Sequence, residues 1–207
     1  MMKIKICGLN PTRDVQLCIN LKINFLGFVF YKKSPRNIIN LKDINILKKY
    51  NPEKSVYVAV CVDPNDNFIK KNILGNFEYI QLHGSETVER VKEIKKMGVK
   101  VIKAIKIKEE KDIDLYKKYE DKVDLILFDS KSMEKSQGIP KGLLDMLPKG
   151  EKFGLAGAIK LENIREYSQL GFNFLDLSSG LERENLKGYK DHLKIKNFMN
   201  KINEFRN

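Results

Sequence analysis

The stretch Val56-Tyr57-Val58-Ala59-Val60-Cys61-Val62 decides the fold, because it is apolar at every position. Successive side chains of a β-strand point to opposite faces of the sheet. A strand that is apolar on both faces is covered on both faces, as the strands of parallel sheets are. We expect this strand to lead into a helix that opens at Asp63-Pro64 and ends near Gly75.

Similar short apolar runs recur along the chain. They are Lys3–Cys7, Phe25–Phe30, Val56–Val62, Tyr79–His83, Val99–Ile105, Leu125–Asp129, Phe153–Ala156 and Phe174–Ser178. Strands that alternate with helices indicate parallel βαβ units. Eight such units in 207 residues predict an α/β protein, a closed (β/α)8 TIM barrel near the small end of its size range. We therefore predict a single domain over residues 1–207, with short loops.

Stretches with the apolar spacing of helices lie between these runs. The other main helices are predicted over Arg13–Leu21, Leu41–Tyr50, Ser85–Gly98, Leu161–Leu170 and Tyr189–Phe205. Residues Lys131–Lys141 have no clear periodicity, so they are predicted to form the longest loop.

Composition excludes several classes of protein. Hydrophobic residues make up 42% of the chain, enough for a substantial core. Cys7, Cys18 and Cys61 are too few and too scattered for a disulfide framework or a zinc site. No apolar run approaches the roughly 18 residues of a membrane-spanning helix, and no secretory signal is recognisable. We therefore expect a cytoplasmic protein with reduced thiols, in which Cys18 and Cys61 belong to the core.

The formal net charge of +12 raises the question of a polyanionic partner. Three lysine pairs fall late in candidate helices, where a cation complements the helix dipole: Lys48-Lys49, Lys95-Lys96 and Lys117-Lys118. In a (β/α)8 barrel these helix ends face away from the mouth at which the strands end. The clustered arginines and interleaved aromatic residues of a nucleic-acid groove are missing from the sequence. We expect no nucleic-acid partner, and a polyanion-binding face stays open as the alternative.

Residues whose side chains can take part in acid–base chemistry end several of the predicted strands. Because residues two apart share a face, Cys7, His83, Asp129 and Asp176 converge at the barrel mouth if their faces look inward. A thiol and a carboxylic acid across a small pocket form a credible base and acid pair. A cation near Cys7 would favour its thiolate. Lys5, one layer deeper, could supply that cation or could instead form an ion pair inside the barrel.

Six stretches, in order along nearly the whole chain, are recognisable together. They are Lys5-Ile6-Cys7-Gly8-Leu9, Leu26–Tyr31 with Ser34-Pro35-Arg36, Gln81-Leu82-His83-Gly84, Val101–Ile105, Leu155-Ala156-Gly157 and Asp176–Glu182. In this combination the sequence resembles phosphoribosylanthranilate isomerase, a cofactor-free (β/α)8 enzyme of tryptophan biosynthesis. The resemblance implies no cofactor and a phosphorylated small-molecule substrate. We also expect no metal and a monomer.

The resemblance also implies the reaction. N-(5-phosphoribosyl)anthranilate would be converted to 1-(2-carboxyphenylamino)-1-deoxyribulose 5-phosphate by an acid- and base-catalysed Amadori rearrangement. By resemblance, Asp129 is the general acid that protonates the furanose ring oxygen, and Cys7 is the general base that removes the C2 proton. Burial in an apolar strand would help Asp129 to stay protonated.

The same resemblance assigns the substrate-binding residues. Arg36 is expected to bind the anthranilate carboxylate through its planar fork. Gly157 and Ser178-Ser179-Gly180 are expected to bind the phosphate through backbone N–H groups after strands seven and eight. Gln81, His83 and Asp176 are expected to line the pocket, although His83 could also be purely structural.

The chain departs from the family pattern in several places. The usual Gly-Gly-Thr-Gly loop after the acid strand is replaced by residues 135–141, in which Gly138 is retained, and Ala158 replaces the second glycine of Ala-Gly-Gly. An alanine resists positive φ angles, so Ala158 would narrow the approach to the backbone. Two alternatives remain: a related histidine-pathway isomerase, which generally uses carboxylates at both catalytic positions, and an inactive barrel that binds polyanions.

Overall fold

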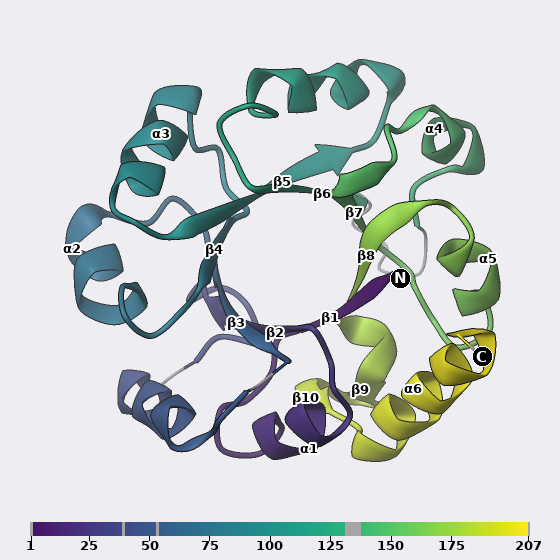
Figure 1. Cartoon of the computed structure of the whole chain (residues 1–207), viewed down its shortest axis with the longest axis horizontal. Helices are drawn as coiled ribbons and strands as arrows, with labels where there is room; N and C mark the ends of the chain where they lie inside the picture. The colour runs from purple at the N-terminus through teal and green to yellow at the C-terminus, as the bar shows by residue number, and fades with distance from the viewer. Residues whose placement is uncertain (1, 39, 53, 131–137, 207) are drawn as a thin grey trace.

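Eight parallel strands follow one another around a closed barrel, in which β8 pairs with β1 as well as with β7. The computed structural model describes residues 2–38, 40–52, 54–130 and 138–206. The strands are β1 (Lys3–Cys7), β2 (Phe25–Phe30), β3 (Val56–Cys61), β4 (Tyr79–Leu82), β5 (Lys100–Ile107), β6 (Leu125–Ser130), β7 (Gly150–Ala156) and β8 (Phe172–Leu177). Figure 1 shows them as an inner ring surrounded by helices. The predicted (β/α)8 barrel is confirmed.

Helical segments of different winding connect the strands. They are α1 (Val15–Asn20), η1 (Leu41–Lys49), α2 (Asp66–Phe68), η2 (Ile69–Ile73), α3 (Val88–Lys96), η3 (Glu110–Lys118), α4 (Lys141–Met146), α5 (Ile164–Ser168), η4 (Ser179–Leu181) and α6 (His192–Arg206). The segments η1, η3 and η4 are 3₁₀ helices, and η2 is a π-helical turn. The three lysine pairs lie in the last turns of η1, α3 and η3, as predicted. Within the described residues, no helix is long and apolar enough to cross a bilayer.

The start of the last predicted helix was wrong. Tyr189 belongs to β10 (Leu186–Lys190), which pairs with β9 (Glu182–Arg183) in an antiparallel hairpin, and α6 begins only at His192. Asn185, at φ 60°, turns the chain between the two strands. Backbone pairing of Lys190 with Glu182 holds this segment extended, which overrides the helical spacing of its residues.

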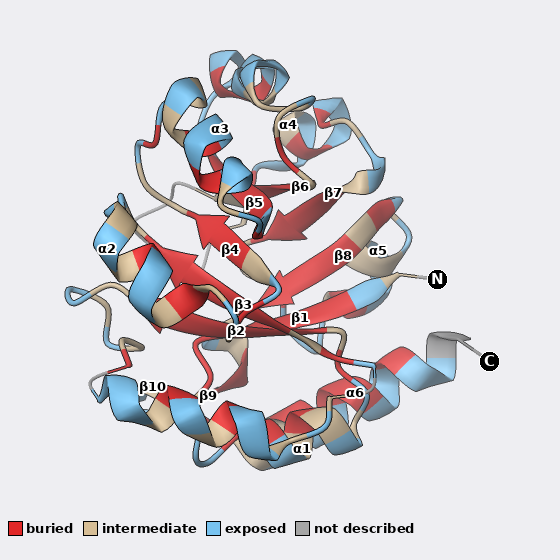
Figure 2. Cartoon of the chain, turned by 60° about the vertical axis from the view of Figure 1, so that its left-hand side comes forward, coloured by how far each residue is buried: buried red, intermediate tan, exposed pale blue. Residues whose placement is uncertain are grey.

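The core has two parts that follow the alternation of each strand. Along β3, Val58 and Val60 point into the barrel, whereas Tyr57, Ala59 and Cys61 pack under the surrounding helices. Both faces of this strand are therefore buried, as its apolar sequence requires. Figure 2 shows buried residues running along the barrel strands and exposed residues on the outer sides of the helices. Cys18 and Cys61 are buried free thiols, as predicted.

Candidate active site

A cavity of about 380 Å³ opens at the mouth where the barrel strands end. All of the candidate site residues predicted from the sequence line it. They are Cys7, Arg36, Gln81, His83, Asp129, Gly157, Asp176, Ser178, Ser179 and Gly180. Because β1 and β6 are separated by β7 and β8 on one side of the ring, Cys7 and Asp129 stand on different walls of one cavity.

Cys7 ends β1 among several charged groups. Two residues earlier, on the same face, Lys5 is fully buried and its Nζ donates to Asp176 Oδ2 at 2.7 Å. Burial raises the pKa of the Cys7 thiol, and the cations of Lys5, Lys190 and Arg36 oppose that rise without cancelling it. Burial alone would lower the pKa of Lys5, but Asp176 and Cys7 outweigh it and raise that pKa. Lys5 therefore fills both of the roles left open by the sequence, as an interior ion pair and as a cation beside Cys7.

Asp129 lies at the end of β6, beyond the apolar layer that contains Leu127. Its side chain is 24% exposed, so it is less buried than the sequence suggested. His83 Nε2 lies 3.2 Å from Asp129 Oδ2, and His83 Nδ1 lies 3.2 Å from Gln81 Nε2. An amide N–H donated to Nδ1 leaves the His83 proton on Nε2, facing Asp129. Gln81, His83 and Asp129 thus form a polar chain that ends on the carboxyl predicted to be the acid.

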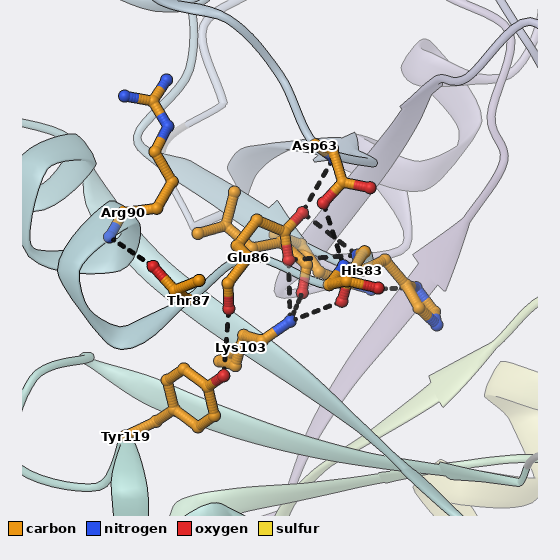
Figure 3. Close-up of polar contacts among 11 residues, drawn as sticks. Asp63, His83, Glu86, Thr87, Arg90, Lys103 and Tyr119 are labelled. Carbon is orange, nitrogen blue, oxygen red and sulfur yellow. Dashed lines mark hydrogen bonds and ion pairs between the residues drawn. The ribbon is translucent and has the colours of Figure 1, made fainter.

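Lys103 of β5 and Glu86 from the loop after β4 hold the backbone around His83 in place (Figure 3). Lys103 Nζ donates to the carbonyl of Leu82 at 3.3 Å and to that of Gly84 at 2.9 Å. The same ammonium binds Glu86 Oε2 at 2.7 Å, and Glu86 Oε1 accepts from the backbone N–H groups of Asp63 and Gly84. Lys103 and Glu86 are both buried. The carbonyl groups on either side of His83 are therefore fixed by one buried ion pair.

Arg36 reaches the cavity from the loop after β2 and is held by an acidic side chain. Its Nε donates to Glu182 Oε1 at 2.5 Å, and its Nη2 donates to Glu182 Oε2 at 2.9 Å. Burial alone would raise the pKa of Glu182, but Arg36 and Lys190 outweigh it and hold that pKa below its ordinary value. The pair is therefore ionised at neutral pH. Arg36 keeps Nη1 for another partner, because no described residue accepts from it.

The loops after β7 and β8 border the cavity with small residues. A Cβ on Gly157, which has φ +106°, would lie 2.7 Å from Ser130 Oγ, and a Cβ on Gly180 would lie 2.6 Å from the carbonyl oxygen of Ile159. Glycine is therefore required at both positions by space as well as by conformation at Gly157. Ala158 takes φ 49° despite its side chain, so the departure noted in the sequence places a strained alanine beside this loop.

The sequence-based search missed three charged residues at or beside this site. Lys106 lines the cavity, and its alternation with Ile102 on β5 was an available signal. Glu182 and Lys190 lie on the hairpin. Lys190 was missed because the helix predicted over Tyr189–Phe205 included it, although it belongs to strand β10. The altered loop residues 135–137 lie outside the described residues. Across the described ranges, no group of three or more His, Cys, Asp or Glu side chains is placed to hold a metal ion.

Comparison with known proteins places the chain among enzymes. The family model "N-(5'phosphoribosyl)anthranilate (PRA) isomerase" matches residues 4–201. The chain belongs to this isomerase family. The N-(5'-phosphoribosyl)anthranilate isomerase of Aquifex aeolicus is 34% identical over 210 residues, which cover 96% of this chain and 97% of the relative.

Solved members of the isomerase family share the barrel. The phosphoribosyl anthranilate isomerase of Thermotoga maritima is 28% identical, with a TM-score of 0.83, and the match covers 99% of this chain and 100% of the relative. A phosphoribosyl anthranilate isomerase in complex with reduced 1-(o-carboxyphenylamino)-1-deoxyribulose 5-phosphate is also 28% identical. Its TM-score is 0.81, with coverage of 99% of this chain and 100% of that one. The isomerase family thus accounts for both the fold and the order of the motifs.

Proposed function

We propose that this chain is a phosphoribosylanthranilate isomerase of tryptophan biosynthesis, which converts N-(5-phosphoribosyl)anthranilate to 1-(2-carboxyphenylamino)-1-deoxyribulose 5-phosphate. Membership of the family supports this function. The observation that carries it in this molecule is the placement of a thiol, Cys7, and a carboxyl group, Asp129, on different walls of one cavity. An isomerisation that moves hydrogen from C2 needs both a proton donor and a proton acceptor at the bound sugar.

In the proposed reaction, Asp129 donates a proton to the furanose ring oxygen as the C1–O bond breaks. The anthranilate nitrogen supplies the electron pair, so the opened sugar is a protonated Schiff base. Cys7, as the thiolate, then removes the C2 proton, and the electrons of that C–H bond neutralise the iminium nitrogen to give an enolamine. Tautomerisation of the enolamine yields the ketone. His83, which faces the Asp129 carboxyl, is placed to orient the acid.

Both ends of the substrate have counterparts in the cavity. We assign the anthranilate carboxylate to Arg36, and the phosphate to backbone N–H groups around Gly157 and Ser178–Gly180. Two buried oxygens of cavity-lining residues, Asp176 Oδ1 and Gln81 Oε1, have no hydrogen-bond partner among the described residues. Unpaired buried acceptors are costly, so they are suited to accept from the sugar hydroxyl groups.

Complementation of a tryptophan auxotroph that lacks this isomerase, together with a fluorescence assay of the purified protein, tests the proposal. Wild type should restore growth and consume the anthranilate substrate. Cys7→Ala and Asp129→Asn should each reduce kcat by about 10²–10⁴-fold, the usual contribution of a general acid or base. Cys18→Ala and Asp114→Asn, which lie outside the cavity, are matched controls. Full activity in either site variant would overturn the assigned role of that residue.

We also propose that residues 1–207 act as one cytoplasmic domain. The barrel closes between the first and the eighth strand, so no subset of its strands completes the ring. The positions of the lysine pairs in the last turns of η1, α3 and η3 account for part of the basic charge without a polyanionic partner.

A further inference from the structure

The hairpin of β9 and β10 brings an acidic side chain to the rim of the cavity. Glu182 is only 7% exposed, and both of its carboxylate oxygens bind the guanidinium of Arg36. Such a bidentate pair fixes the plane of the guanidinium as well as its position. The pair leaves Nη1 of Arg36, a residue that lines the cavity, without a partner among the described residues.

Close backbone contacts press the hairpin and the β1 loop against Arg36. A Cβ on Gly188 of β10 would lie 2.2 Å from the carbonyl oxygen of Pro35, and a Cβ on Gly8 would lie 2.4 Å from Arg36 Cδ. Neither Gly8 nor Gly188 has room for a Cβ atom. The aliphatic stem of Arg36 is therefore confined by Gly8, and its loop is confined by the hairpin.

A buried lysine extends this arrangement to the other end of the cavity. Lys190 is 1% exposed, and its Nζ lies 3.4 Å from Glu182 Oε1 and donates to the carbonyl of Ser178 at 3.0 Å. Ser178 in turn donates from Oγ to the carbonyl of Cys7 at 3.1 Å. Lys190 thus links the Glu182–Arg36 pair to the loop assigned to the phosphate. Through Ser178, the same lysine is linked to the strand that carries Cys7.

We propose that Glu182 is a positioning residue that aims the guanidinium of Arg36 at the ring carboxylate of the substrate. Together with Lys190, it sets the separation between the carboxylate-binding and phosphate-binding ends of the cavity. The hairpin would thereby select phosphorylated N-aryl sugars whose ring carries a carboxylate. The inference rests on the proposed function, because it takes Arg36 as the carboxylate-binding residue.

The physical reason for such a device lies in the properties of arginine. A guanidinium carries five N–H donors on a flexible stem, and an unpaired, partly buried guanidinium would turn toward whichever acceptor is near. Glu182 occupies one edge of the fork and leaves the remaining donors to the ligand. Placing the same carboxylate in the cavity itself would instead repel an anionic substrate.

The test compares two substrates in two matched variants. Glu182→Gln removes the charge from the pair, and Glu184→Gln removes a charge from the 88%-exposed Glu184 side chain in the turn of the same hairpin. Each protein is assayed with N-(5-phosphoribosyl)anthranilate and with the aniline analogue that lacks the ring carboxylate. Glu182→Gln should raise KM about tenfold for the carboxylated substrate, as loss of a charge-assisted contact does, with a smaller change in kcat. It should change the KM of the aniline analogue little, and Glu184→Gln should leave both substrates unaffected.

Equal losses with the two substrates would overturn the inference and indicate a merely structural role, as would no loss at all. An Arg36→Met background adds a second readout, because Glu182→Gln should then have no further effect on the preference for the carboxylate. Glu182→Asp keeps the charge and should recover part of that preference if Glu182→Gln proves too unstable to assay.

Calorimetric binding of reduced 1-(o-carboxyphenylamino)-1-deoxyribulose 5-phosphate, and of its analogue without the carboxylate, separates this inference from the proposed function. A wild-type protein that binds both ligands with the expected preference but shows no turnover would contradict the function and keep the inference. A protein that binds neither ligand would overturn both. In the wild-type protein, removal of the carboxylate should weaken binding by at least about tenfold.

Discussion

Cys7 shows at the scale of one residue how burial and neighbouring charge compete. Burial raises the pKa of its thiol, and the Lys5 ammonium is the largest opposing influence. In the proposed reaction the Cys7 thiolate removes a proton, so we expect the activity of the free enzyme to rise with pH as this group ionises.

Lys5→Met should move the alkaline rise of kcat/KM to higher pH. Loss of the cation raises the pKa of Cys7, and an adjacent opposite charge usually shifts a pKa by about 1–3 units. A pH profile of kcat/KM measures the shift. Lys3→Met, an exposed position two residues earlier on β1, is the control and should retain the wild-type profile. An unchanged profile in Lys5→Met would refute the influence of Lys5 on Cys7.

Strand alternation predicted the residues of the cavity well, because the side-chain period of a strand is a local property. Cys7, His83, Asp129 and Asp176 all line it. The partner of Arg36 could not be predicted in the same way, since Glu182 is 146 positions away in the sequence and reaches Arg36 only through a hairpin that was assigned in part to a helix. The partial exposure of Asp129 was also missed, because apolar neighbours in sequence do not cover a residue near the end of a strand, at the mouth of the barrel.

At the scale of one element, the loop between β4 and α3 depends on the Lys103–Glu86 pair. Burial alone would raise the pKa of Glu86, but Lys103 and the backbone N–H groups of the loop outweigh it and lower that pKa below 4.5. A carboxyl group whose pKa falls on folding stabilises the folded protein at every pH above the pKa that the group has in the unfolded chain. This stabilisation is therefore present above pH 4.5 and is lost as the pH falls through the lower, folded value.

Glu86→Gln should destabilise the protein by about 3–5 kcal/mol, because it leaves a buried ammonium without a counter-charge. Urea unfolding at neutral pH measures the loss, and repetition below pH 4 should show a smaller difference from wild type. Glu89→Gln, an exposed carboxylate in the first turn of α3, serves as the control. Equal stability of Glu86→Gln and wild type at neutral pH would contradict the role given to the pair. A double Glu86→Leu, Lys103→Met variant should lose less than the single variant.

Helix winding was less predictable than strand position. The apolar spacing of Leu41–Tyr50 correctly indicated a helix, but the segment winds as the 3₁₀ helix η1. Its Ile44 and Leu47 are buried three positions apart, a spacing that 3₁₀ and α-helices both accommodate on one face. The period of apolar residues in a short segment therefore does not distinguish the two.

At the scale of the whole molecule, the predicted monomer can be measured directly. Light scattering coupled to size exclusion should give the mass of one chain at concentrations used for assay. A solved phosphoribosylanthranilate isomerase from Thermotoga maritima, 27% identical to this chain, is described as dimeric, with monomers generated from it. A mass of two chains would contradict the monomer, and dilution would then show whether activity follows the dimer.

The pairing of Lys5 with Asp176 across the seam between β1 and β8 has a consequence for biosynthesis. Lys5 is synthesised in the first strand, and its counter-ion Asp176 lies 171 residues further along the chain. The first seven strands are synthesised before the Lys5 ammonium has this carboxylate as a partner. Lys5 can therefore reach its fully buried position in the barrel only after β8 has been made. The nascent chain therefore completes both its closed ring and the Lys5–Asp176 ion pair beside Cys7 in one late event, when the eighth strand leaves the exit tunnel.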